Sequence, residues 1–307
     1  MKTEEHYLQL NQHTKKTLIF HLGHSAGFYS EINNMVFAII YCVQHNICFK
    51  LYSSDANFRE KDGWDDYFNP FCKEIRFRPL HYINGRNVSP TLGIKTKVYT
   101  PIFRFMCKNI FLTQDLWDEI RCIDKTFMPI QISGINVDYF HEATKRIIHI
   151  IYRFNDQTRR EIDFLKKTIS IEGEYLGFHI RGGDKITECE IVNVENYMGL
   201  ANSLSNIRQI FVSTDDYRFY ERLCEKYPDY KFFTISEPSS KGYLQSDFVN
   251  STPAERRKSM INMFASMEFL LESQHTICTY SSNIGMFLGM MMGDRAHGVD
   301  FPEWIIW

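Results

Sequence analysis

The sequence predicts an α/β protein with two halves, each built around a parallel sheet. Residues 17–53 read as strand, helix and strand, residues from 169 onward alternate strands with helices, and an amphipathic helical pattern covers 138–168 between them. Repeated strand–helix units place strands in a parallel sheet with helices on both faces. We therefore expect one domain over 1–167 and a second over 168–307.

The first half opens with an apolar run at 17–22, a glycine-containing loop at 23–27, an apolar-periodic helix to about residue 45 and a second apolar run at 47–52. This order predicts a β-α-β unit. Residues 54–100 are polar, aromatic and rich in turn formers, so we predict no order of elements there.

Two further helices are predicted in this half, at 101–122 and 138–168. The second ends in a charged amphipathic run at 159–167. We expect this long helix to bridge the two halves.

The second half is more regular. Strands are predicted at 174–180, 209–213, 230–234 and 276–280, and helices at 194–204, 217–226, 253–274 and 283–292. In such sheets ligands bind beyond the carboxyl ends of the strands. Polar groups at those ends are therefore the candidate functional residues.

Composition excludes some classes of partner. The 35 basic and 37 acidic side chains give a formal net charge of -2, too small a field to attract nucleic acid or an anionic membrane. The N-terminus is charged and polar, and no apolar segment is long enough to cross a bilayer, so we expect neither a signal peptide nor a membrane span. The eight cysteines form no CxxC pair. This usage favours reduced thiols and a cytoplasmic location.

The first candidate site is Phe178-His-Ile-Arg-Gly-Gly-Asp-Lys185, where a strand breaks at a glycine pair. The Arg181 guanidinium suits phosphate oxygens, Lys185 adds a point charge, and the glycines allow backbone amides to approach a bulky ligand. A sharp turn in which the arginine and aspartate pair with each other is the alternative.

The second candidate is Cys278-Thr-Tyr-Ser-Ser-Asn283, which leads from a strand into an apolar helix. A helix N-terminus presents N–H groups and a positive dipole end, so the end beside Ser281 and Ser282 can hold a diphosphate. The alternative is an ordinary serine or asparagine cap.

Two acidic pairs complete the set. Asp215 and Asp216 follow the strand at 209–213, and no spaced acidic motif in this half supports a metal site, so a helix cap is the favoured role for one of them. Glu188 and Glu190 follow the basic loop, where a carboxylate can remove a proton from an acceptor hydroxyl. Solvated loop acids are the alternative for this second pair.

Together these motifs resemble the α-1,6-fucosyltransferase group, which includes the bacterial nodulation fucosyltransferases. The resemblance rests on five segments in order: Phe178 to Lys185, Glu195-Asn-Tyr-Met198, Ile210 to Asp216, Lys226 to Phe232 and Phe269 to Asn283. It implies a GT-B-like fold with two Rossmann-type domains facing a cleft, of which the first is the acceptor side. It also implies a GDP-fucose donor, a glycan acceptor, inversion at the transferred sugar carbon and no metal.

The resemblance also implies roles for individual residues. His179 and Arg181 would contact the donor diphosphate, Lys185 would stabilise charge on the departing phosphate, and Glu188 would be the base. Tyr197, Asp215 and Asp216 would shape or brace the donor pocket, and Ser282 with its helix end would hold phosphate.

Three positions depart from the family pattern. Gly182 stands where the family has a second arginine, and the segment before Tyr197 is one residue shorter, so Glu188 and Glu190 compete for the role of base. Ser266 stands where the family has an aspartate that reads guanine. Because serine cannot supply that charge, transfer of another sugar, for example from a UDP-sugar, remains an alternative. A non-catalytic sugar- or nucleotide-binding protein of the same fold is the other.

Overall fold

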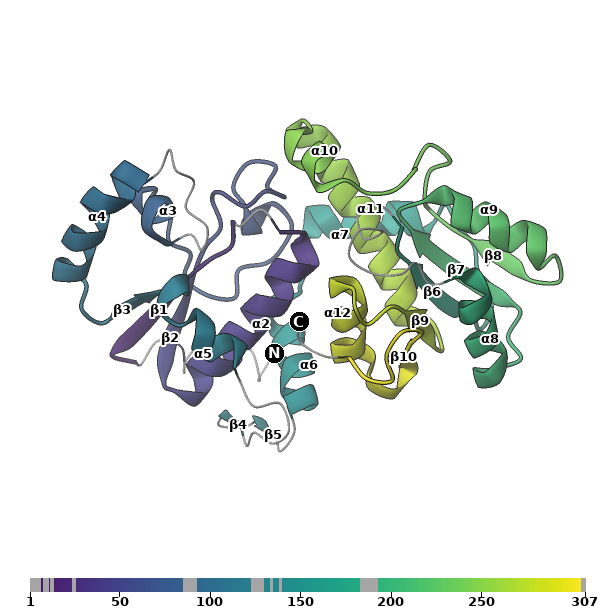
Figure 1. The fold of residues 1–307 in the computed structure, drawn as a ribbon, viewed down its shortest axis with the longest axis horizontal. Coiled ribbons are helices and arrows are strands. Elements are labelled where there is room, and N and C mark those ends of the chain that lie inside the picture. The colour runs from purple at the N-terminus through teal and green to yellow at the C-terminus, as the bar shows by residue number, and fades with distance from the viewer. Residues whose placement is uncertain are drawn as a thin grey trace. The chain divides into compact units, whose positions relative to one another are not determined.

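The computed structural model describes residues 7, 11, 14–23, 26–84, 93–122, 130–132, 135–137, 140–182 and 193–304. The chain divides into two compact units, Met1–Asn155 and Asp156–Trp307 (Figure 1). Each unit contains its own parallel sheet. None of the helices among the described residues is long and apolar enough to cross a bilayer.

The first unit is built on a three-stranded sheet. Its central strand β1 (Lys16–His21) pairs in parallel with β2 (Ile47–Tyr52) and β3 (Ile110–Leu112), and helix α2 (Phe28–Gln44) connects β1 to β2. The last four residues of β1 are buried, as expected for the middle strand of a covered parallel sheet. The predicted β-α-β opening is confirmed.

Short helices, two longer helices and an antiparallel strand pair complete the described part of this unit. They are η1 (Trp64–Asp66), α3 (Pro79–Asn84), α4 (Gly93–Met106), η3 (Thr113–Asp115), α5 (Trp117–Arg121), the antiparallel pair β4 (Ile130–Ile132) and β5 (Ile135–Val137), and α6 (Phe140–Ile151). The predicted helix at 101–122 is wrong, because β3 interrupts it. The apolar residues of β3 pair with Thr17–Ile19 of β1. The hydrogen bonds and burial gained by joining the sheet outweigh the helical hydrogen bonds that are lost.

The long helix predicted at 138–168 is also wrong. It ends at Ile151 and begins again as α7 (Asp156–Lys166). Between the two helices, Phe154 bridges to Phe68 and the Asn155 N–H donates to the Tyr67 carbonyl at 3.0 Å. These long-range bonds replace the helical ones, and the division between the units falls at this break.

The second unit follows the predicted alternation closely. Its elements are α7, β6 (Leu176–Ile180), α8 (Val194–Leu204), β7 (Gln209–Thr214), α9 (Tyr217–Lys226), β8 (Lys231–Phe233), α10 (Gln245–Asn250), α11 (Pro253–Glu272), β9 (Thr276–Cys278), α12 (Asn283–Met292), η5 (Gly293–Arg295) and β10 (Ala296–Gly298). Helix α10 and strand β10 were not predicted. The α7 helix packs against α11 in this unit, with Arg159 Nη1 2.7 Å from Glu268 Oε1.

Strand order in the second sheet is β10-β9-β6-β7-β8, and every pair is parallel. Helices α8 and α9 pack together, as do α11 and α12, and Figure 1 draws the two pairs on opposite sides of the sheet. Renumbered from β6 as the first strand, this is the 3-2-1-4-5 order of a doubly wound nucleotide-binding fold. The core contains the alternating apolar residues of the central strands, including Phe178, Val212 and Ile277.

Candidate active site

The order of the second sheet reverses between β6 and β9. From β6 the chain moves to β7 and β8 on one side, and then returns to β9 and β10 on the other. The connections leaving β6 and β9 therefore diverge at the carboxyl edge, which is where ligands bind in open α/β sheets. Arg181 and Gly182 follow β6 at this edge, and the Thr279–Ser282 turn follows β9.

His179 is the penultimate residue of β6 and is 5% exposed. Its Nδ1 has no hydrogen-bond partner among the described residues. Burial, assisted by the positive charge of Arg181, lowers the pKa of His179 from 6.5 to about 3. The ring is therefore neutral near pH 7, and a neutral imidazole can act as a hydrogen-bonding group.

Tyr197 holds β6 from the α8 side. Its hydroxyl donates to the His179 carbonyl at 3.0 Å, and its ring lies 5.5 Å from that of Phe178. The side chain is fully buried. Tyr197 therefore fixes the strand that carries His179.

Arg181 is partly buried and directs its guanidinium toward an aromatic face. Its Cζ lies 5.7 Å from the centre of the Tyr243 ring, within the range of a cation–π contact. Tyr243 belongs to the long loop between β8 and α10. The loop and the arginine thus stand together at the carboxyl edge.

Asp215 connects the loops after β6 and β8 to the end of β7. Its Oδ1 accepts from the Gly182 N–H at 2.7 Å, and its Oδ2 accepts from the Tyr243 N–H at 3.4 Å. Burial raises the pKa of this carboxyl group, against the lowering effect of the Gly182 amide and the Arg181 charge. Asp215 therefore positions both loops.

Gly182 occupies a confined space. A Cβ atom built there would lie 3.1 Å from Asp216 Cβ and 3.1 Å from Phe219 Cε2. These contacts are tighter than ordinary van der Waals separations, so an arginine at this position would require its neighbours to move. The packing around Gly182 therefore suits the glycine that stands here in place of the family's second arginine.

Asp216 begins α9 as its N-cap. Its Oδ1 accepts from the Arg218 N–H at 3.1 Å, and the Arg218 Nε donates to the same carboxylate. The hydrogen bonds and charge of Arg218 lower the pKa of this carboxyl group. The helix-cap role favoured for this acidic pair is confirmed at Asp216, and its carboxylate is already engaged.

Ser282 is the N-cap of α12. Its Oγ accepts from the Gly285 N–H at 2.9 Å and donates to the Thr279 carbonyl at 2.8 Å. The Ser281 N–H donates to Asp300 Oδ2 at 2.9 Å, and the Tyr280 N–H donates to Asp300 Oδ1 at 2.7 Å. Ser282 therefore shapes the turn through an Oγ that is already bonded and Ser281 through its backbone N–H, and the positive dipole end of α12 lies at this turn.

Ser266 lies on α11, partly buried, between the buried residues Ala265 and Met267. No hydrogen bond among the described residues joins it to the strand-end group. The structure thus brings together His179, Arg181, Tyr197 and Asp215, and among the described residues no hydrogen bond links Ser266 to this group.

Lys185, Glu188 and Glu190 lie outside the described residues. At the strand ends of this unit, the described side chains assemble no group of three metal-ligating residues.

Two positioning residues were missed by the sequence analysis. Asp300 follows β10, a three-residue strand too short to show periodicity, and Tyr243 lies in a loop without any pattern. The signal available for Asp300 was a carboxylate just after a Gly-Val pair near the last predicted helix. Only the fold shows that it reaches back to the turn after β9.

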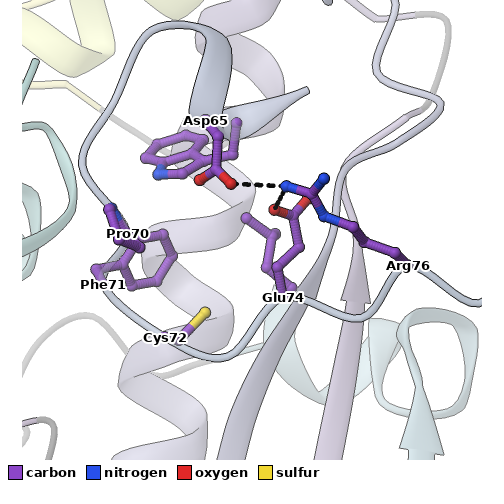
Figure 2. Close-up of a pocket in the computed structure, with 8 residues that line it drawn as sticks. Asp65, Pro70, Phe71, Cys72, Glu74 and Arg76 are labelled. Carbon is purple, nitrogen blue, oxygen red and sulfur yellow. Dashed lines mark hydrogen bonds and ion pairs between the residues drawn. The ribbon is translucent and has the colours of Figure 1, made fainter. Parts of the chain in front are cut away.

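The first unit contains a pocket of about 250 Å³ (Figure 2). It is lined by Leu51, Trp64, Asp65, Pro70, Phe71, Cys72, Glu74 and Arg76. Arg76 is paired within the chain: its Nη2 lies 2.7 Å from Asp65 Oδ2 and 3.6 Å from Glu74 Oε2.

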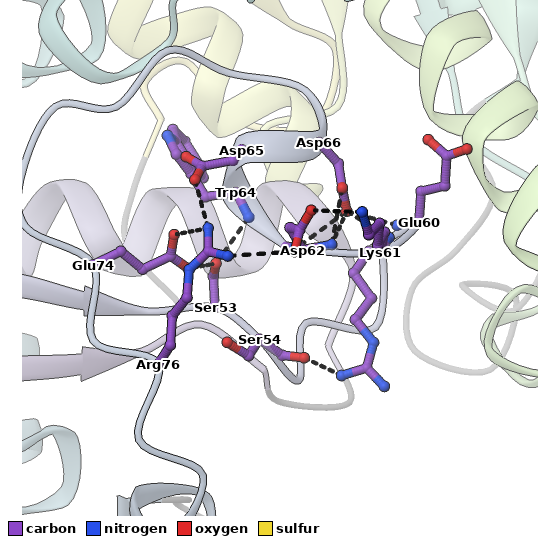
Figure 3. Close-up of polar contacts among 12 residues, drawn as sticks. Ser53, Ser54, Glu60, Lys61, Asp62, Trp64, Asp65, Asp66, Glu74 and Arg76 are labelled. Atoms are coloured by element: carbon purple, nitrogen blue, oxygen red, sulfur yellow. Dashed lines mark hydrogen bonds and ion pairs between the residues drawn. The ribbon is translucent and has the colours of Figure 1, made fainter.

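The loop beside this pocket is held by its own polar groups (Figure 3). The Asp66 carboxylate accepts from the backbone N–H groups of four successive residues, 60–63, and Ser53 Oγ accepts from the Trp64 N–H at 2.8 Å. Trp64 is only 1% exposed and stacks on Phe68 at 4.3 Å. The aromatic and acidic groups of this loop therefore serve its packing.

Comparison with known proteins gives one family and several related structures. The sequence model of the family described as alpha-(1,6)-fucosyltransferase N- and catalytic domains matches residues 130–291, more than half of the 307-residue chain. The NodZ alpha-1,6-fucosyltransferase soaked with GDP-fucose is 12% identical, with 90% of this chain and 93% of that chain covered and a TM-score of 0.53.

Two further structures give the same result. NodZ from Bradyrhizobium is 14% identical, with 88% of this chain and 91% of that chain covered and a TM-score of 0.52. A mutant of Arabidopsis thaliana FUT1 in complex with GDP is 10% identical, with 96% and 73% covered and a TM-score of 0.55. At these identities the structures establish a shared GT-B-like fold, and the family match adds the relationship by sequence. The chain belongs to the alpha-(1,6)-fucosyltransferase family.

Proposed function

We propose that the protein is an inverting glycosyltransferase that moves L-fucose from GDP-fucose onto a glycan hydroxyl. Family membership supports the reaction class, and two of the related structures named above were soaked with GDP-fucose or are in complex with GDP. The observation that carries the proposal is the placement of Arg181 at the reversal point of the second sheet. In this assignment the second unit binds the donor and the first unit serves the acceptor.

The donor diphosphate would bind at the carboxyl edge between β6 and β9. Arg181 offers a planar fork to phosphate oxygens, and the N-terminus of α12 offers its dipole. His179 contributes a neutral hydrogen-bonding group because its pKa is lowered to about 3. Since these groups lie where negative charge develops on the leaving diphosphate, they stabilise the transition state without a metal.

The chemical step needs a base and a further cation. We assign the base to Glu188 or Glu190, which would take the proton of the acceptor hydroxyl while its oxygen forms the new bond to the anomeric carbon. The bond from that carbon to the diphosphate breaks, the diphosphate leaves with the electron pair, and Lys185 meets the charge. Attack from the face opposite the leaving group inverts the anomeric centre.

The test is transfer together with nucleotide-dependent thermal stabilisation. We expect GDP and GDP-fucose to raise the unfolding temperature more than UDP does, and NMR of the product to show the inverted linkage. Arg181→Ala should weaken GDP binding by about 10- to 150-fold, the loss of a charged hydrogen bond. The matched control is Arg208→Ala, because Arg208 lies over the Tyr230 ring at 4.6 Å, at the amino end of β7.

A protein that neither transfers fucose nor responds to GDP would contradict the proposal. Equal loss of GDP binding in both arginine variants would remove the assignment of Arg181.

Ser266 favours one second candidate. If this serine replaces the aspartate that reads guanine in the family, another base such as uracil becomes acceptable while the fold and the diphosphate site stay the same. Stabilisation by a UDP-sugar and not by GDP-fucose would select that candidate. Ser266→Asp should then shift the preference toward GDP.

A further inference from the structure

Three potential metal ligands meet at the carboxyl edge of the first sheet. His21 is the last residue of β1, Asp55 follows β2, and His81 lies on α3. Asp55 Oδ2 is 2.8 Å from His81 Nδ1 and 3.9 Å from His21 Nε2, and all three ligand atoms lie within 4.8 Å of one another. Ligand atoms around a tetrahedral ion with bonds of about 2.0–2.2 Å are roughly 3.3–3.6 Å apart, so small side-chain movements complete the geometry.

Neighbouring residues orient the Asp55 carboxylate and leave room beside the His21 ring. The Tyr52 hydroxyl donates to Asp55 Oδ2 at 2.7 Å, and Arg59 Nη1 lies 3.5 Å from the other oxygen. A Cβ at Gly23 would lie 2.7 Å from His21 Nε2, so glycine is the residue that leaves room beside this buried ring nitrogen. Carboxylates that bind a metal typically accept hydrogen bonds of the kind that Tyr52 donates to Asp55.

We propose that His21, Asp55 and His81 form a Zn²⁺ site in the first unit. Two imidazole nitrogens and one carboxylate oxygen form a donor set that suits zinc, whereas Mg²⁺ and Ca²⁺ prefer oxygen ligands throughout. The side chains of His81 and Asp55 are 30% and 20% exposed, which provides a path for the ion and a fourth position for water. The three residues belong to the first unit and the proposed donor residues to the second, and the zinc proposal does not depend on the proposed reaction.

The experiment uses the full-length protein after chelator treatment. Calorimetric titration with Zn²⁺ should show one tight equivalent, and Co²⁺ should give visible bands of an N/O-ligated ion without the thiolate charge-transfer band that cysteine ligands produce. His81→Gln and Asp55→Asn should each weaken binding at least about 100-fold, since loss of even an outer partner costs roughly 10- to 100-fold. Tyr52→Phe, which keeps all three ligands, should weaken it by about that smaller factor.

The matched control is His297→Gln. His297 Nε2 lies 3.0 Å from His275 Nδ1 in the second unit, the other close histidine pair among the described residues. Zinc binding that disappears in this control, survives in His81→Gln, or shows a thiolate band with Co²⁺ would overturn the proposal. Absence of binding to the wild type would overturn it as well, leaving Asp55 and His81 as an ordinary ion pair. If Asp55→Asn does not fold, the His81→Gln variant, at a partly exposed position, provides the test.

Discussion

Asp215 holds the two loops that frame the proposed diphosphate site. It is partly buried, accepts from the Gly182 and Tyr243 amides, and lies near the Arg181 charge. In the proposed site, Asp215 binds the two loops and does not itself contact the diphosphate. It instead fixes where the amides and the guanidinium stand before a ligand arrives, which is how positioning contributes to binding.

Asp215→Ala should therefore lower the affinity for GDP by about tenfold, because the loops lose a charge-assisted hydrogen bond. Calorimetry on the variant measures this. Asp229→Ala, at an exposed position between α9 and β8, is the control and should leave the affinity unchanged. Equal affinities in all three proteins would show that Asp215 does not position the site.

His179 makes stability depend on pH in a defined direction. Its pKa is about 3 in the folded protein and 6.5 when unperturbed, so between these values the unfolded chain binds a proton that the folded protein does not. Stability is therefore full above pH 6.5 and falls by about 1.4 kcal/mol for each pH unit below it, until the folded pKa is reached. Denaturant unfolding from pH 7 to 4.5 should show a shallower fall in His179→Gln than in the wild type. Parallel slopes would contradict this.

Helix α12 begins at a close approach between backbones. A Cβ at Gly285 would lie 2.0 Å from the Thr279 carbonyl oxygen, so the turn after β9 and the first turn of the helix fit only with glycine there. The Ser282 cap and the Asp300 carboxylate hold the same turn from its two ends. The direction of the α12 dipole thus depends on the close packing at Gly285 together with these two polar groups.

Gly285→Ala should destabilise the protein by about 1–3 kcal/mol through overpacking, and it should weaken GDP binding because the helix start moves. Gly199→Ala is the matched control: this glycine lies on α8, where an added Cβ meets no atom within 4 Å. There, better helix propensity should stabilise by up to about 1 kcal/mol. Thermal unfolding with and without GDP separates the two outcomes, and similar behaviour of the two variants would refute the backbone argument.

The whole chain consists of two units with separate sheets, and the two inferred ligands belong to different units. A ligand that binds only the native state stabilises the part that contacts it, so local opening reports where it binds. GDP should slow amide hydrogen exchange most in β6, β9 and α12. UDP is the control nucleotide, and protection by GDP that is greatest in β1 and β2 would reverse the assignment of the units.

The sequence by itself determined the α/β class and most elements of the second unit, with α10 and β10 as the exceptions. Its strands are apolar runs bounded by turn formers, and helices α8, α9 and α12 begin and end as predicted, since their periodicity and caps are local signals. The motif around His179 and Arg181 could be recognised for the same reason, because the strand and the glycines that end it lie in one continuous segment. The family resemblance rested on such contiguous segments.

Only the tertiary structure decided what depends on contacts between distant residues. Strand β3 forms because Ile110–Leu112 finds β1, and the break at 152–155 forms because Phe154 and Asn155 meet residues 67 and 68. The clamp of Asp300 on Tyr280 and the meeting of His21, Asp55 and His81 are of this kind too. A local sequence pattern reflects the conformational preference of one turn, helix or strand. These arrangements are instead stabilised by burial and pairing between residues that are far apart in the chain, so no short window of sequence includes both partners.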